Sequence, residues 1–415
     1  MRKVLNQCLS YAEKKCGRRR VACRPWKVFL EVASSCNLRC ITCMHHGSRF
    51  GGVMSDEVFD RVRPLLQYAR VVNEVGYGEP LIDKGFLNKL AYAKRQGASV
   101  YMYSNGTLLS ARIAEEMVSL GLDQITFSID GATRETFESI RLGASREKVL
   151  ANIRGLAEAK RRLGRSRPLL RANYVGMRRN IGELPRAVDV VADVGIEELV
   201  LSDFWPHRPE LENECLGLME AEARTIAAEA ASRAKQRRIT FIAPPVFHGR
   251  PNEGTVCEGE SNAGCEADAA CNAAEGDGFC NAAGPCPNAA GQPRETAPTH
   301  EAPAVDYRQY PCYEPWQTVY ITHDGHVRPC CVIGQSMGNL MKTPLEEIWN
   351  NRAYQLLRQT VNSSQPAYSD CRNCLLRKRV RLPVRDAVRL GLNSLRAHGL
   401  RGTARKVAKY VSEYL

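Results

Sequence analysis

Residues 28–43 read VFLEVASSCNLRCITC, a strand-like run followed at once by three closely spaced cysteines. The cysteines have the spacing Cys-x3-Cys-x2-Cys, and they are Cys36, Cys40 and Cys43. Three thiolates can hold three corners of an iron-sulfur cube and leave the fourth iron open, whereas four cysteines close a 4Fe-4S cluster. The same residues are also compatible with a zinc site completed by His45 or His46, or with unrelated buried thiols.

The chain from residue 28 to about 243 repeats a strand, a polar loop and a helix six times, which is the pattern of parallel βα units. This pattern predicts an α/β fold with a partial (β/α)6 TIM-like barrel, and a doubly wound sheet is the competing arrangement. The predicted strands are 28–34, 71–76, 98–104, 124–130, 169–177 and 198–204. The predicted helices include 84–96, 110–120, 147–163, 184–194 and 211–238, and 239–243 is a possible further strand.

Four successive predicted strands end in polar motifs, namely the cysteine loop, GYGEP (76–80), SNG (104–106) and SIDG (128–131). In a parallel barrel the loops at the carboxyl ends of the strands meet at one rim. The glycine turn can bring backbone carbonyls and amides close to an ammonium group, and the Asn, Ser and Asp side chains can bind the hydroxyls of a ribose. Each motif alone is typical of an ordinary turn, but the four together predict one polar ligand.

A second group of cysteines follows near the carboxyl end of the chain. Two of them enclose a predicted hairpin, YITHDGHVRPC (320–330), with its turn at Asp324 and Gly325, and the other two have the spacing Cys-x2-Cys. Four thiolates in two pairs fit a closed 4Fe-4S cluster or a structural zinc site, and the spacing alone does not decide between them. The four are Cys312, Cys330, Cys371 and Cys374. The neighbouring Cys331 is expected to be a buried thiol.

These motifs make residues 28 to about 243 resemble the radical S-adenosylmethionine (radical SAM) enzymes. The resemblance implies that the first three cysteines bind a 4Fe-4S cluster, whose open iron takes the amino and carboxylate groups of S-adenosylmethionine. It implies cofactor contacts by Gly76, Gly78, Glu79, Asn105, Ser128, Asp130, Arg141 and Asn173, with Arg171 as an alternative to the last. Many family members have an aromatic residue where this chain has Thr42, and we expect this departure to alter adenine packing only.

The second cysteine group resembles the SPASM/twitch auxiliary-cluster domain of the same superfamily. The resemblance implies that its four cysteines hold a second 4Fe-4S cluster. A full SPASM domain would have further cysteines soon after Cys374, and this chain has none there. The shorter twitch form, with one auxiliary cluster, is therefore expected.

The resemblance implies an oxidoreductase or maturase that cleaves S-adenosylmethionine to a 5'-deoxyadenosyl radical, which takes a hydrogen atom from the substrate. The electron is expected from a reductase, a flavodoxin or a ferredoxin. The predicted substrate is a small polar metabolite such as an amino sugar or aminocyclitol, and a ribosomal peptide or protein side chain is the alternative. A cluster- or zinc-containing RNA-binding protein is the alternative from another functional class.

Charge and composition divide the chain further. Residues 1–27 carry nine Lys and Arg against one acid and residues 377–415 carry eleven against two, whereas the rest carries 38 against 42, so no nucleic-acid partner is expected. Residues 244–306 form an insertion that is rich in Pro, Gly, Ala and Asn. It contains five cysteines whose spacings match no ligand pattern, namely Cys257, Cys265, Cys271, Cys280 and Cys286. The predicted parts are a basic arm (1–27), the barrel (28–243), the insertion (244–306), the auxiliary-cluster domain (307–380) and a basic amphipathic tail (381–415).

The composition also gives expectations about location. The sequence has no apolar run of about 18 residues and no apolar signal-peptide core, so a cytoplasmic protein is expected. Its seventeen cysteines in a reducing compartment favour metal or cluster binding over disulfides. The basic tail is expected to pack on the protein itself, with contact to an anionic membrane or an acidic partner as the alternative.

Overall fold

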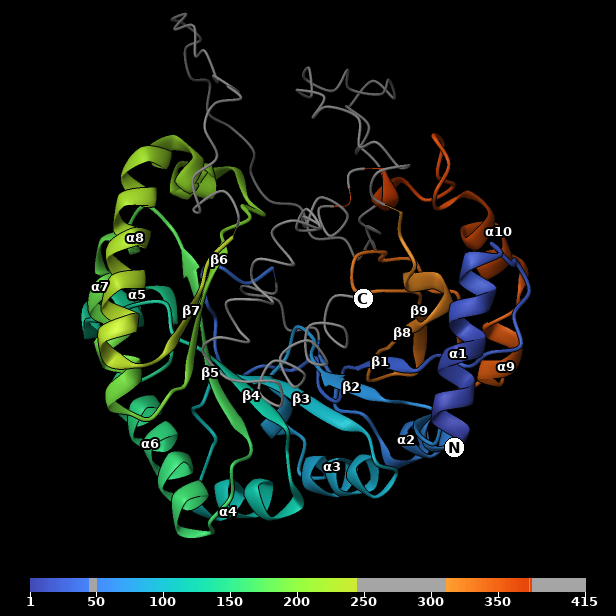
Figure 1. Ribbon diagram of the computed structural model, residues 1–415, viewed down its shortest axis with the longest axis horizontal. Helices are drawn as coiled ribbons and strands as arrows, with labels where there is room; N and C mark the ends of the chain where they lie inside the picture. The colour runs from blue at the N-terminus through green and yellow to red at the C-terminus, as the bar shows by residue number, and fades with distance from the viewer. Residues whose placement is uncertain (45–50, 245–310, 373, 375–415) are drawn as a thin grey trace, which may run out of the picture. The chain divides into compact units, whose positions relative to one another are not determined.

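The computed structural model describes residues 1–44, 51–244, 311–372 and 374, and every structural statement below concerns these residues. They form one ten-stranded sheet with the strand order β10-β9-β8-β1-β2-β3-β4-β5-β6-β7 (Figure 1). Strands β1 to β7 pair in parallel with their neighbours. Their bounds are β1 Lys27–Leu30, β2 Val71–Glu74, β3 Ser99–Ser104, β4 Gln124–Ser128, β5 Leu169–Gly176, β6 Glu198–Asp203 and β7 Thr240–Ile242.

Helices alternate with these strands and lie along the outer face of the curved sheet (Figure 1). They are α2 Asp56–Leu66, α3 Phe86–Arg95, α4 Ala111–Leu120, α5 Arg134–Ile140, α6 Arg146–Arg162, α7 Leu184–Asp193 and α8 Glu220–Arg237. Ser or Thr hydroxyls at Ser55, Ser110, Thr133 and Ser145 accept hydrogen bonds from first-turn amides, which explains where four of the helices begin. This alternation confirms the predicted α/β fold.

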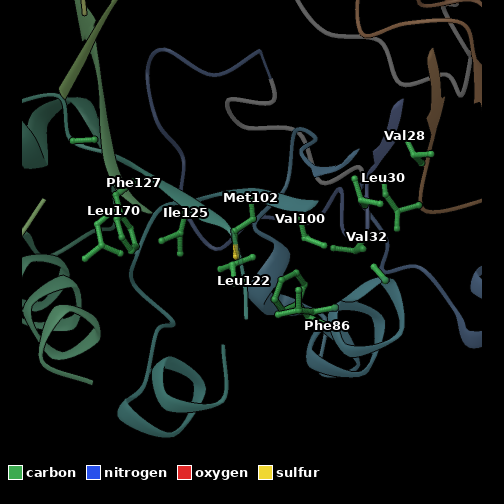
Figure 2. Packing of buried hydrophobic residues seen from close by; sticks show 14 of the residues in the cluster. Val28, Leu30, Val32, Phe86, Val100, Met102, Leu122, Ile125, Phe127 and Leu170 are labelled. Carbon is green, nitrogen blue, oxygen red and sulfur yellow. The ribbon is translucent and has the colours of Figure 1, made fainter. Parts of the chain in front are cut away.

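The hydrophobic core lies between the strands and the helices. Side chains alternate along each strand, so one set faces the helices and the other faces the interior of the curved sheet. On β5 this alternation is visible as buried Leu170, Ala172 and Tyr174 between less buried neighbours. Figure 2 shows the helix-facing set packed together, with Val28, Leu30, Val100, Met102, Ile125, Phe127 and Leu170 from the strands and Phe86 from α3.

The carboxyl-terminal segment extends the same sheet. Strand β8 (Thr318–Ile321) pairs in parallel with β1, and the hairpin from β8 to β9 (His326–Arg328) turns at Gly325, whose φ of 83° favours glycine. The remaining elements of this segment are β10 (Gly338–Asn339), α9 (Leu345–Ile348) and α10 (Arg352–Thr360). The hairpin was predicted, but its place beside the first strand was not. The predicted domain boundary near 307 lies outside the described residues.

Two segments differ from their predicted structure. The basic arm contains a helix, α1 (Arg2–Lys15), and the helix predicted over 211–238 begins only at Glu220. Two 3-10 turns, η3 (Pro209–Glu214) and η4 (Leu216–Met219), precede it, so Cys215 lies in extended backbone between them. The reason is tertiary, because Arg178 N–H donates to the Glu214 carbonyl and Arg179 pairs with the Glu214 carboxylate. These bonds hold the segment against the loop after β5.

Several predicted features lie outside the described residues. They are the insertion with its five cysteines, the tail over 381–415, and the alternative zinc ligands His45 and His46. No helix among the described residues is long and apolar enough to cross a membrane.

Candidate functional site

The first three cysteines lie on the loop that follows β1, at the carboxyl end of the strand. The loop is fixed by backbone bonds from Arg39 N–H to the Leu142 carbonyl and from Ile41 N–H to the Ile140 carbonyl, each 3.0 Å long. Cys40 is buried and Cys36 is exposed, and the Cys43 N–H donates to the Cys40 carbonyl. The loop therefore turns back on itself between Cys40 and Cys43.

Two side chains from other loops direct donors at two of these sulfurs. The amide Nδ2 of Asn105, after β3, lies 3.9 Å from the Cys36 Sγ, and Nη1 of Arg141, after α5, lies 3.8 Å from the Cys40 Sγ. Burial raises the pKa of the Cys40 thiol, and the Arg141 guanidinium opposes that shift. Donors around cysteine sulfurs are a feature of cluster sites, because they stabilise the charge on the thiolates. The donors of Asn105 and Arg141 are therefore compatible with a negatively charged cluster bound to these cysteines.

Arg141 is held in place by Asp130, at the end of β4. The carboxylate Oδ2 lies 2.6 Å from Nε and 2.5 Å from Nη2 of Arg141, and Oδ1 accepts from the Val175 N–H. Asp130 is fully buried. Its two oxygens are thus bonded within the protein, and it acts on the site through Arg141.

Glu79, in the GYGEP turn, is also bonded within the protein. Its Oε1 accepts from the Ser104 hydroxyl at 2.9 Å and from the Leu81 N–H, and its Oε2 accepts from the Asn105 N–H at 2.7 Å. Burial raises the pKa of Glu79 to about 7, although these hydrogen bonds oppose the shift. The carboxyl group therefore joins the end of β2 to the end of β3 and positions Asn105.

Gly76 and Gly78 let the same turn approach the cysteine loop closely. A Cβ at Gly78 would overlap the carbonyl oxygen of Ala33 and lie 2.5 Å from that of Ser35. A Cβ at Gly76 would lie 2.6 Å from the carboxylate Oε1 of Glu31. The Glu79 N–H uses this closeness to donate to the Ser35 carbonyl at 2.9 Å. The two glycines are therefore needed for the turn to pack beside the loop that holds the cysteines.

The interior of the sheet presents further polar side chains. Ser128 on β4 is the register partner of Asn173 on β5, and the Asn173 Oδ1 accepts from the Ser202 hydroxyl at 2.6 Å. Arg171, the alternative to Asn173, forms an ion pair with Glu198 at 2.6 Å. The structure thus brings Ser128 and Asn173 together on one interior row, while the guanidinium of Arg171 is paired with a neighbouring strand.

The four carboxyl-terminal cysteines line one small cavity. Apolar side chains make up most of the remaining wall, among them Pro315, Ile333, Leu357 and Val361. Among the described residues, no three His, Cys, Asp or Glu side chains lie close enough together to hold a single metal ion. A cluster places each thiolate on a different iron, so thiols around a cavity are compatible with it. The cavity is lined by Cys312, Cys330, Cys371 and Cys374.

Burial raises the pKa of Cys330 well above its usual value. Cys331 was expected to be buried, but it is exposed and does not line this cavity. A bound metal would offset the cost of ionising the Cys330 thiol, because ligation stabilises the thiolate.

The sequence did not reveal a polar pair that joins the loop after β1 to the loop after β8. Glu31 on the loop side of β1 is buried, its Oε1 accepts from the Tyr77 N–H, and its Oε2 lies 3.9 Å from Nδ1 of His323, which follows β8. The His323 Nδ1 is buried and makes no hydrogen bond among the described residues. The missed signal was the pairing of β8 with β1, because only that pairing brings His323 beside Glu31.

Comparison with protein families matches two parts of the chain. Residues 30–202 match the model of the Radical SAM superfamily, and residues 312–375 match that of the SPASM iron-sulfur cluster-binding domain. A radical SAM domain implies a 4Fe-4S cluster and S-adenosylmethionine, and a SPASM domain implies additional iron-sulfur clusters. Both predicted cofactor classes are therefore confirmed at the level of the family.

Three curated relatives each share 26% identity with this chain over the aligned residues. One is the tungsten-containing aldehyde ferredoxin oxidoreductase cofactor-modifying protein of Pyrococcus furiosus, aligned over 45% of this chain and 54% of its own length. Others are a probable GTP 3',8-cyclase of Methanococcus maripaludis (46% and 63%) and an AdoMet-dependent heme synthase of Methanosarcina barkeri (41% and 48%). The chain thus spans roughly half to just under two thirds of these relatives.

Solved structures support the fold. SuiB of Streptococcus suis bound to S-adenosylmethionine has a TM-score of 0.58 at 12% identity, and it covers 89% of this chain and 75% of its own. The structure of anSMEcpe with bound AdoMet has a TM-score of 0.51 at 15% identity and covers 81% and 84%. The predicted TIM-like barrel with a carboxyl-terminal domain is confirmed by these likenesses.

Proposed function

Because this chain belongs to the radical SAM superfamily and carries a SPASM domain, we propose that it cleaves S-adenosylmethionine reductively and abstracts a hydrogen atom from its substrate. The observation that carries this proposal is the cysteine loop after β1, where Asn105 and Arg141 direct donors at the sulfurs of Cys36 and Cys40. When bound, the cluster and S-adenosylmethionine supply a 5'-deoxyadenosyl radical. The protein's own task is to bind, to orient and to exclude water.

The residues that would hold the first cluster are Cys36, Cys40 and Cys43. Asn105 and Arg141 stabilise the thiolates through the contacts described above, and Asp130 orients Arg141. The four cysteines around the apolar cavity would hold the second cluster. When bound there, a cluster would supply an electron acceptor.

The residues that would contact S-adenosylmethionine divide into two groups. Gly76 and Gly78 allow the backbone of their turn to approach the cofactor amine, and Glu79 fixes that turn from behind. Ser128 and Asn173 lie on one interior row where a ribose could be bound. In this arrangement Asp130 and Glu79 are positioning residues, because their oxygens are bonded to the protein.

We infer that the substrate is a small polar molecule that is oxidised at carbon. The interior of the sheet presents polar side chains that could bind a polar substrate, such as Asn173, Ser202 and the pair Arg171–Glu198. The names of the curated relatives point the same way, since GTP, heme and a tungsten cofactor are all small molecules. A peptide is the second candidate, supported by the likeness of the fold to SuiB bound to its precursor peptide SuiA (TM-score 0.55).

Oxidation of an alcohol or amine at carbon removes a hydrogen atom, an electron and a proton. The hydrogen atom leaves to the deoxyadenosyl radical, the electron leaves to an acceptor, and the proton requires a base. Glu31 with His323 is the candidate base, because this pair joins the loop after β1, which carries the first cysteine group, to the loop after β8, which precedes Cys330. Glu31→Gln should therefore lower product formation while the cofactor is still cleaved.

The test uses reconstituted, oxygen-free protein with dithionite and S-adenosylmethionine. Amino sugars, aminocyclitols and a peptide pool are supplied separately, and 5'-deoxyadenosine and the loss of two hydrogens from the substrate are measured by mass spectrometry. Coupled turnover with a small polar substrate supports the proposal, whereas coupling with peptides alone selects the second candidate. A protein with its full iron content that forms no 5'-deoxyadenosine contradicts both.

A further inference from the structure

Helix α1 has its polar side inward and its apolar side outward. The residues buried against the rest of the chain are Asn6, Ser10 and Glu13. The exposed large hydrophobic residues include Val4 (54% exposed), Leu5 (61%), Leu9 (40%) and Tyr11 (56%). An amphipathic helix of a globular protein normally shows the opposite arrangement.

The inward face is fixed by hydrogen bonds. Asn6 exchanges two bonds with the backbone of Arg24, at 2.9 and 2.7 Å, and the Ser10 hydroxyl donates to the Trp316 carbonyl at 2.8 Å. The Glu13 carboxylate accepts from the N–H groups of Ala22 and Cys23. Since all three polar side chains are bonded, the helix cannot rotate its apolar face inward without leaving them unsatisfied.

The outward face is a continuous apolar stripe. At 100° per residue, positions 1, 4, 5, 8, 9, 11, 12, 15 and 16 lie on one side of the helix; all nine are exposed, and the apolar stripe on this side ends at Lys15 in the last turn. We call this surface the α1 stripe; its members are Met1, Val4, Leu5, Cys8, Leu9, Tyr11 and Ala12. Scattered exposed apolar residues need no explanation, but a continuous stripe marks an interaction surface.

Charge selects the partner of the α1 stripe. Residues 1–20 carry seven Lys and Arg, and their one acid, Glu13, is buried against the rest of the chain. Four of these basic residues lie in α1 itself; the other three, at 18–20, follow it directly and are exposed. A second copy of the chain, or the equally basic tail, would bring like charges together, which is unfavourable.

We propose that the α1 stripe binds the surface of an anionic lipid bilayer. An apolar stripe flanked by Lys and Arg is the arrangement of helices that lie in the membrane interface, where apolar burial and attraction to anionic headgroups add together. α1 packs against η6 (Glu314–Trp316) beside α9 and α10 (Figure 1), so binding through α1 would hold the enzyme at the bilayer by the end of the sheet that bears β8.

The test is flotation of the full-length holoprotein with vesicles of phosphatidylcholine alone or with about 30% phosphatidylglycerol. The wild type should bind the anionic vesicles, and Leu5→Glu/Leu9→Glu should weaken that binding by at least about tenfold. The matched control is Leu163→Glu/Leu218→Glu, because these leucines are also exposed (37% and 61%) but lie far along the chain; it should bind as the wild type does. Arg18→Gln/Arg20→Gln should weaken binding to the anionic vesicles alone.

Three outcomes overturn the proposal. Failure of the wild type to float with anionic vesicles excludes a lipid partner, and undiminished binding of the Leu5→Glu/Leu9→Glu protein assigns the binding to another surface. A change of oligomeric state in that variant, measured by light scattering, assigns the α1 stripe to a second copy of the chain. Iron content and S-adenosylmethionine cleavage, measured for each variant, separate these outcomes from a failure of the proposed function.

Discussion

The carboxylate of Asp130 holds the guanidinium of Arg141 through two contacts, 2.6 Å to Nε and 2.5 Å to Nη2. The pair leaves Nη1 free to face the Cys40 sulfur at 3.8 Å. Asp130 lies two residues after β4 and Arg141 follows α5 directly, so the fold itself brings a fixed positive charge to the cysteine loop. A buried pair of this kind is costly to break on one side, because the remaining charge is left without a partner.

Asp130→Asn should therefore disturb the site and the fold together. We expect the free energy of unfolding to fall by about 3–5 kcal/mol, and cleavage of S-adenosylmethionine to fall with it, since Arg141 loses its partner. The matched control is Glu116→Gln, which breaks the exposed pair of Glu116 with Arg112 on α4 and should cost less than about 0.5 kcal/mol. Denaturant unfolding and 5'-deoxyadenosine yield measure the two effects. Equal stability of the two variants would contradict this role of Asp130.

Gly78→Ala should displace the cysteine loop, because the added Cβ would overlap the Ala33 carbonyl. We expect loss of roughly half of the bound iron and of S-adenosylmethionine cleavage, while the second cysteine group keeps its iron. Gly155→Ala is the control, since Gly155 lies within α6 with open space around it and should gain about 0.5–1 kcal/mol of stability. Full iron content and activity in Gly78→Ala would show that the close approach is not required.

Glu74 makes stability depend on pH. The side chain is fully buried without hydrogen bonds to its carboxyl oxygens among the described residues, and burial, with Asp83 adding to it and Lys89 opposing, raises its pKa to about 8. Between its ordinary value of 4.5 and this value the folded protein holds a proton that the unfolded chain has lost. The stability contribution of Glu74 is thus full below 4.5 and falls as the pH rises towards 8.

Glu74→Gln should remove this contribution to the pH dependence. We expect the wild type to lose on the order of 1 kcal/mol per pH unit more than the variant between about pH 5.5 and 7.5. Glu57→Gln, at an exposed position on α2, serves as the control and should follow the wild type. Guanidinium unfolding at the two pH values gives the comparison, and a wild type that becomes more stable relative to Glu74→Gln as the pH rises would contradict the assignment.

The local pattern of apolar and polar residues in the sequence predicted the repeating βα units of the barrel well. The observed strands β1 to β6 lie within the predicted ranges or differ at an end by one residue, because each strand is a short apolar run bounded by polar loops. The strand-end motifs were also found, since parallel strands bring their carboxyl ends to one edge whatever the details of packing.

What escaped prediction depends on contacts between distant parts of the chain. The pairing of β8 with β1 has no local signal, and it alone brings His323 to Glu31. From the sequence alone, the polar face of α1 would be expected to face solvent. It faces inward because its side chains bond to the backbone of Arg24 and Trp316. Similarly, the sequence shows that Glu79 is near the cofactor site but not that its oxygens are bonded to Ser104 and Asn105.

The most direct test of the central claim is the replacement of Cys36, Cys40 and Cys43 together by alanine in reconstituted, oxygen-free protein. The wild type should bind about eight irons per chain, and the triple variant should keep about four and form no 5'-deoxyadenosine. The matched control replaces two exposed cysteines, Cys8 in α1 and Cys16 directly after it, and should retain both the iron and the activity. Formation of 5'-deoxyadenosine by the triple variant at the wild-type rate would contradict the account.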